Sequence, residues 1–141
     1  MVKEIKKILV PLDGSKNSFR GLDEAISLAK KNNASITGLF VIQAFPTEIG
    51  VLRTAIGKAL SKQSKNFLSQ AQKKCKQKDI DFIDIIDYGD EGAKIVSYAK
   101  KIKADLIVMG SRGIGGIKQL ILGSTTNYVL HNSKIPVLVV K

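Results

Sequence analysis

The sequence predicts an α/β fold, a doubly wound five-stranded parallel sheet with helices on both faces. Five short apolar runs alternate with four segments of helical periodicity along the chain, and that alternation is typical of parallel sheets with crossover helices. No linker or second composition regime interrupts it, so we expect a single domain over residues 1–141. The content of 44% hydrophobic and 25% charged residues is ordinary for a globular protein.

Short runs rich in Val, Ile and Leu predict the strands. They lie at residues 5–12, 35–43, 80–89, 104–110 and 135–140. The run at 80–89 differs from the others because its apolar residues alternate with aspartates. We therefore expect that strand to have an exposed face or to lie near a sheet edge.

Apolar residues spaced three and four apart predict the helices. The stripes are Phe19, Leu22, Ile26 and Ala29; Leu52, Ile56, Leu60, Phe67, Ala71 and Cys75; and Ile95, Val96, Ala99 and Ile102. Asp90 and Glu91 begin the third helix, where acidic side chains suit the helix dipole. Ser15 is the expected cap of the first helix, and Ser124 that of a short fourth helix, "STTNYVLH".

Several classes of protein are excluded or disfavoured by composition. No apolar run approaches the roughly 18 residues of a membrane span, and the start of the chain lacks a secretory signal, so we expect a cytoplasmic protein. Cys75 is the only cysteine, which excludes an internal disulfide and the usual zinc clusters. It is either a thiol activated by neighbouring lysines or, as we favour, a small residue on the apolar edge of a helix.

The net charge of +11 raises the question of a polyanionic partner. The arginines, however, are only Arg20, Arg53 and Arg112, and the aromatic residues are sparse. Specific nucleic-acid recognition prefers arginine forks and aromatic platforms. Solvated lysine faces are the favoured interpretation, and dedicated nucleic-acid binding is disfavoured.

Ligands of doubly wound folds bind at the carboxyl ends of the strands, where the strand order reverses. Here those ends are "VPLDGS" and "VMGSRG", and the second opens a glycine-rich loop. The loop is neither a P-loop, because Gly116 stands where its lysine belongs, nor a dinucleotide fingerprint, because Lys118 replaces the third glycine. Its spacing is instead Gly110-x2-Gly113-x9-Gly123-Ser124.

This spacing resembles the nucleotide-binding motif of the universal stress protein family, in its ATP-binding branch. "ILVPLDGS" is similar to the first strand and aspartate of that family, and "IPVLVVK" to its closing strand. The resemblance in element order extends over essentially the whole chain. It implies a site for ATP, or for AMP or ADP, with Mg²⁺ held mainly by the phosphates, since the sequence offers no obvious acidic pair for the metal.

The resemblance assigns residues to both ends of this nucleotide. Those on the adenine side are Pro11, Leu12, Asp13, Val41 and Met109, and those on the phosphate side are Gly110, Arg112, Gly113, Gly123, Ser124 and Thr125. The phosphate assignments have a physical basis as well. Glycines let the backbone approach an anion closely, and the first amides of a helix are a ready anion site. Asp13 is alternatively only part of a turn.

A regulatory, nucleotide-binding stress-response protein with at most slow ATP hydrolysis is the favoured function. Hydrolysis needs a group that positions water, no acid is evident near the loop, and His131 lies at the far end of its helix. The alternatives are a nucleotide-hydrolysing or nucleotide-transferring enzyme and an interaction module that binds no nucleotide. The family resemblance implies a homodimer, which would pair residues 136–140 of two copies and cover an apolar sheet edge. A protein partner stays unidentified.

Overall fold

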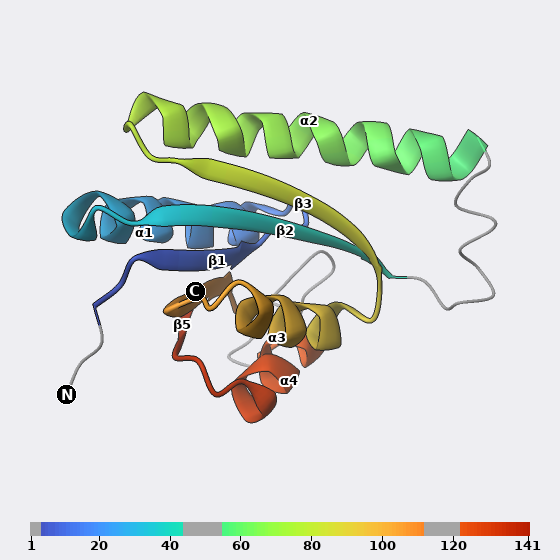
Figure 1. Cartoon of the computed structure of the whole chain (residues 1–141). Coiled ribbons are helices and arrows are strands. Elements are labelled where there is room, and N and C mark those ends of the chain that lie inside the picture. The colour runs from blue at the N-terminus through green and yellow to red at the C-terminus, as the bar shows by residue number, and fades with distance from the viewer. Residues whose placement is uncertain (1–3, 44–54, 112–121) are drawn as a thin grey trace.

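A computed structural model describes residues 4–43, 55–111 and 122–141 (Figure 1), and only the backbone of residues 55–61. The predicted site residues Arg112 and Gly113 lie outside the described residues. Strands and helices alternate as predicted. They are β1 (Lys7–Pro11), α1 (Lys16–Asn32), β2 (Ser35–Gln43), α2 (Ala55–Gln77), β3 (Phe82–Gly89), α3 (Glu91–Lys101), β4 (Leu106–Gly110), α4 (Ser124–Asn132) and β5 (Val137–Val140).

The five strands form one parallel sheet in the order β3-β2-β1-β4-β5. In register, Ile8 of β1 lies between Ile36 of β2 and Leu106 of β4. The chain winds outward from β1 to β3 and then returns to add β4 and β5 on the other side. The strand order therefore reverses between β1 and β4, and the predicted doubly wound sheet is confirmed.

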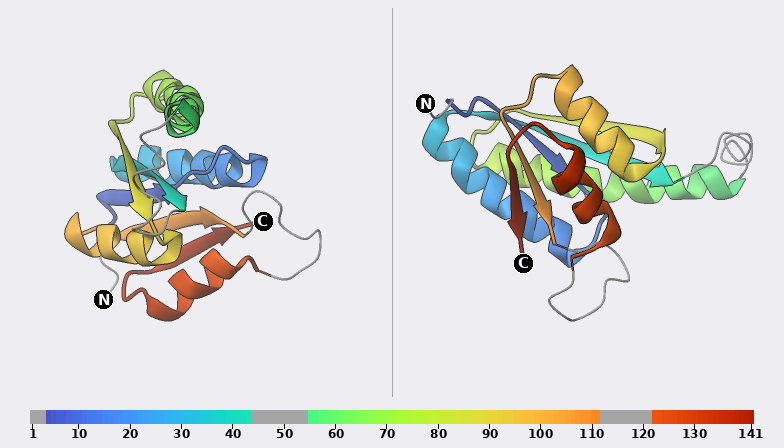
Figure 2. Two further views of the ribbon diagram at one scale, coloured as in Figure 1. Left: turned by 90° about the vertical axis from the view of Figure 1, so that its right-hand side faces the viewer. Right: turned by 90° about the horizontal axis from the view of Figure 1, so that it is seen from below.

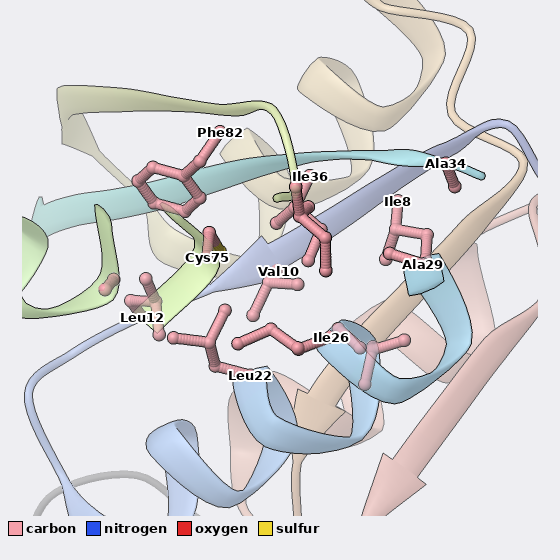
Figure 3. Packing of buried hydrophobic residues seen from close by; sticks show 14 of the residues in the cluster. Ile8, Val10, Leu12, Leu22, Ile26, Ala29, Ala34, Ile36, Cys75 and Phe82 are labelled. Atoms are coloured by element: carbon pink, nitrogen blue, oxygen red, sulfur yellow. The ribbon is translucent and has the colours of Figure 1, made fainter. Parts of the chain in front are cut away.

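Helices cover both faces of the sheet, α1 and α2 on one side and α3 and α4 on the other (Figure 2). Alternate residues of each strand point to opposite faces. On the first face, Val10 of β1 and Leu12, just after β1, pack with Leu22 of α1 and Cys75 of α2 (Figure 3). The residues of the second core are Leu9, Leu39, Val41, Ile95, Ala99, Ala104, Ile107, Met109 and Val129.

The edges of the sheet agree with the sequence pattern. β3 is an edge strand, and its Ile83 side chain is 65% exposed. β5 forms the opposite edge, with Leu138 exposed. It begins two residues later than predicted, after Pro136, which has no N–H for a strand ladder. In the described ranges, none of the helices is both long and apolar enough to cross a membrane.

Cys75 is a core residue of α2, as favoured above. Its side chain is fully buried, and burial raises the pKa of the thiol from 9.0 to about 11, against the smaller opposite effect of Lys74. The alternative of a lysine-activated thiol is therefore wrong. Desolvation of the thiolate outweighs the nearby positive charge.

Candidate functional site

The two strand ends that the sequence marked lie side by side at the reversal point of the sheet. Asp13 follows β1, Gly110 ends β4, and the two strands are paired. Two hydrogen bonds attach the start of α4 to the end of β4. The amide of Gly123 donates to the carbonyl oxygen of Ser111 at 2.8 Å, and the Thr126 hydroxyl donates to the carbonyl oxygen of Gly110 at 3.0 Å. Both ends of the glycine motif thus meet at one edge of the sheet.

The start of α4 carries no side-chain cap. Gly123, not the predicted Ser124, is the N-cap residue, and no side chain there accepts a hydrogen bond from the helix. The first bond of the helix runs from the amide of Asn127 to the carbonyl of Gly123 at 3.0 Å. The amides of Ser124, Thr125 and Thr126 precede it, and such amides have no acceptor within their own helix. Ser124 is an exposed residue and Thr125 a half-buried one.

Asp13 belongs to a hydrogen-bonded turn that starts α1. Its Oδ1 accepts from the amide of Ser15 at 2.9 Å, and Ser15 Oγ accepts from the amide of Ser18 at 3.1 Å. Ser15 is therefore the cap of α1, as predicted. Asp13 is half-buried beside it. A carboxylate has about four lone-pair sites, so the bond to Ser15 leaves capacity for further donors.

The apolar residues assigned to the adenine side are buried, and Leu12, Val41 and Met109 belong to the two cores. Pro11 and Leu12 are buried, with Leu12 on the α1 and α2 face. Val41 and Met109 are only 6% and 4% exposed, on the α3 and α4 face. All four pack within the protein at the carboxyl edge, and their contacts with a base stay predictions.

Gly110 has a packing role that the sequence did not indicate. A Cβ at this position would contact the Asn17 side-chain oxygen and would lie 2.8 Å from the Asn17 carbonyl oxygen. Real Cβ atoms do not come so close to a backbone atom. The close approach of α1 to the end of β4 therefore gives this glycine a packing role in addition to the predicted approach to a phosphate.

Glu91 is a site residue that the sequence analysis missed. It is the first residue of α3, and its Oε2 accepts a hydrogen bond from Thr125 Oγ1 at 3.5 Å. Burial and the negative charge of Asp13 raise the pKa of the Glu91 carboxyl, with Thr125 acting in the opposite direction. The expectation that no acid lies near the phosphate side is thus wrong. The only signal was the position of Glu91 just after β3, because strand ends of a parallel sheet share one edge.

His131 and the metal-ligating side chain types complete the description of the site. His131 lies in the last turn of α4, at the opposite end from Gly123, as predicted. In the described part of the chain, no three or more His, Cys, Asp or Glu side chains come together in a way that could hold a metal ion.

The sequence model of the universal stress protein family matches residues 4–141. The chain belongs to the universal stress protein family. It is 33% identical to universal stress protein MJ0531 of Methanocaldococcus jannaschii, over 96% of this chain and 82% of that protein. Among solved structures of the family, UspA from Lactobacillus plantarum is 28% identical with a TM-score of 0.88 and coverage of 99% of both chains. Another universal stress protein, solved in complex with cAMP, is 27% identical with a TM-score of 0.70 and coverage of 98% of both chains.

Proposed function

We propose that this universal stress protein binds an adenine nucleotide, with ATP as its ligand, and acts as a regulatory binding protein with at most slow hydrolysis. One observation carries the proposal. The start of α4 lacks a side-chain cap and is held at the reversal point of the sheet by the bonds of Gly123 and Thr126. Such a helix start attracts phosphate, and the relative solved with cAMP supports an adenine nucleotide.

The phosphates would contact the amides and hydroxyls at the start of α4. Ser124 and Thr125 offer both kinds of donor, and Arg112 and Gly113 of the motif would complete this side. Asp13 would accept a hydrogen bond from the base or the ribose. Adenine would lie against Pro11, Leu12, Val41 and Met109, in line with the family resemblance.

A magnesium ion bound with ATP would be held mainly by phosphate oxygens, since Mg²⁺ commonly uses one or two carboxylates at most and keeps several waters. When bound, it would neutralise part of the phosphate charge. The start of α4, with the hydroxyls of Ser124 and Thr125, would hold the phosphates to which the ion binds.

An ATP-hydrolysing or nucleotide-transferring enzyme is the second candidate. The observation that favours it is the carboxyl of Glu91 beside Thr125, because an acid near a phosphate site can orient water. Release of ADP at an enzyme-like rate would support this candidate. Release far slower than nucleotide exchange would support the regulatory function.

Isothermal titration of the nucleotide-stripped protein with Mg·ATP tests the proposal. We expect saturable binding near one nucleotide per chain. Gly123→Val and Gly113→Val should each abolish it while circular dichroism stays unchanged, because a branched side chain blocks close approach of the backbone to phosphate. Ser69→Val, at an exposed position of α2, serves as the control and should bind normally.

Normal binding by either glycine variant would contradict the assignment of the motif. Flat heats for the wild-type protein, with no ATP-dependent shift in Tm, would favour the interaction module that binds no nucleotide.

We also propose that β5 pairs with β5 of a second copy to form a homodimer. It is an edge strand with Leu138 exposed. Pairing would cover the backbone N–H and C=O groups of this edge, which could otherwise pair with strands of other chains and cause aggregation. Sedimentation at micromolar concentration should give twice the chain mass. A single-chain mass at all concentrations would contradict the pairing.

A further inference from the structure

We propose that Glu91 is a specificity-determining residue whose carboxylate opposes phosphate at the start of α4. Affinity would then depend on the charge that the nucleotide carries and on whether this one side chain is protonated. The inference rests on the proposed nucleotide binding and adds a residue to that site. Its basis is the meeting of α3 and α4 at the carboxyl edge of the sheet.

Two hydrogen bonds hold Glu91 at this edge. Its amide donates to Gln43 Oε1 at the end of β2 at 2.8 Å, which ties the first turn of α3 to the sheet. Its carboxylate accepts from the hydroxyl of Thr125 at 3.5 Å. Thr125 lies in the first turn of α4 and is a proposed phosphate donor. A bound phosphate and the Glu91 carboxylate would therefore compete for the same hydroxyl.

Among the described residues, the charged groups that act on Glu91 are negative. Asp13, after β1, and Asp90, the cap of α3, both act on it electrostatically, and its other neighbours Gln43 and Thr125 are neutral. One turn along α3, Lys94 instead pairs with Asp87 of β3 at 3.2 Å. Within the described ranges, no Lys or Arg forms an ion pair with Glu91.

A phosphate bound at Thr125 would place a further negative charge beside the half-buried Glu91 carboxylate. Like charges at short range in a partly desolvated site repel more strongly than in water. The repulsion grows with the charge of the ligand, is absent for uncharged adenosine, and disappears when the carboxyl takes up a proton. Burial and Asp13 already raise the pKa of Glu91 in the absence of ligand, which favours that uptake.

The test compares the wild-type protein with Glu91→Gln, by isothermal titration with ATP, AMP and adenosine in metal-free buffer. Gln keeps the length of the side chain and can still accept from Thr125. At about pH 7.5 we expect Glu91→Gln to bind ATP about tenfold more tightly, with a smaller gain for AMP and none for adenosine. Toward about pH 5.5 the difference in ATP affinity between the two proteins should narrow, because the Glu91 carboxyl of the wild-type protein takes up a proton and becomes neutral like Gln. Protonation of ATP in the same pH range also weakens the repulsion in the wild-type protein, so it narrows the difference in the same direction.

Glu4→Gln is the matched control, because it removes the same charge from an exposed residue before β1, at the other end of the sheet. Its affinity for each of the three ligands should equal that of the wild-type protein at both pH values. Glu91→Ala, which also removes the bond to Thr125, should keep the same ranking of gains among the ligands.

Equal or weaker ATP binding by Glu91→Gln, or an equal gain for adenosine, would overturn the role of Glu91 and leave the proposed function intact. Failure of both proteins to bind ATP and adenosine would overturn the proposed function, and this inference with it.

Discussion

Helices α3 and α4 start at the same edge of the sheet and on the same face, but their first turns are stabilised differently. The start of α3 is capped by its own chain. Asp90 accepts from the amide of Ala93 at 2.9 Å, and Gln43 accepts from the amide of Glu91. At the start of α4, Gly123 supplies no side chain for a cap.

A helix can therefore be positioned without a side-chain cap if its first turn is attached to the neighbouring strand end. Thr126 and the amide of Gly123 provide that attachment for α4. Its first amides then stay available for a ligand, whereas those of α3 are used by the protein itself. In our proposal this asymmetry decides which of the two helix starts binds phosphate.

We expect the greatest loss of stability from a side chain at Gly110, the end of β4 to which α4 is attached and against which α1 packs. Gly110→Ala would place a Cβ 2.8 Å from the Asn17 carbonyl oxygen, a backbone atom that cannot rotate away. We expect the free energy of unfolding to fall by about 3 kcal/mol, as for an overpacked core. Urea denaturation followed by circular dichroism measures it.

Gly21→Ala is the matched control for Gly110→Ala, because its Cβ would lie 3.3 Å from the Gly110 amide nitrogen, a much milder contact. Alanine is also the better helix former by about 1 kcal/mol, so we expect a nearly neutral change. Equal stability of Gly110→Ala and the wild-type protein would contradict the packing role of Gly110.

The next effect comes from giving α4 the cap that α3 has. Gly123→Asp would supply a carboxylate that accepts from the first amides and repels phosphate. We expect ATP affinity to fall about 100-fold, whereas the free energy of unfolding should change by only a few tenths of a kcal/mol. Isothermal titration and thermal melts give the two quantities.

Asp90→Asn, which keeps a capping oxygen on α3, should leave both ATP affinity and stability close to wild type. Gly123→Asn, which caps α4 without a charge, should lose less affinity than Gly123→Asp. If Gly123→Asp bound ATP as tightly as the wild-type protein, the start of α4 would not be the phosphate site.

The smallest effect that we expect is a pH-dependent difference in Tm between the wild-type protein and Glu91→Gln. The pKa of Glu91 is raised in the folded protein, so the folded state holds this proton more tightly than the unfolded chain does. The charged carboxylate therefore destabilises the fold above its folded-state pKa, and the destabilisation is lost as pH falls through that pKa. Glu91→Gln should raise Tm by on the order of a few degrees at about pH 7.5. The two proteins should melt together at about pH 3.5, where both side chains are neutral. A constant difference at all pH values would contradict an electrostatic cause.

Much of the fold could be predicted because its signals are local. β-Branched apolar runs and spacings of three and four residues depend only on near neighbours. They located the strands to within two residues at either end, predicted an exposed face or an edge position for 80–89, and marked Ser15 as the cap of α1. The reversal of strand order between the first and fourth strands could also be predicted, since alternating strands and helices leave few topologies for a parallel sheet.

The contacts that distinguish the site depend on residues far apart in the chain. Glu91 meets Thr125 across 34 positions, and no periodicity relates the two. The packing of Asn17 against Gly110, and the start of α4 at Gly123 in place of Ser124, likewise follow from how α1 and α4 approach the end of β4. The sequence by itself determined the elements, their order and the motif. Which side chains come together at this edge of the sheet follows from the tertiary structure, because the strand order places the strand ends side by side and steric contacts fix how closely the helices approach them.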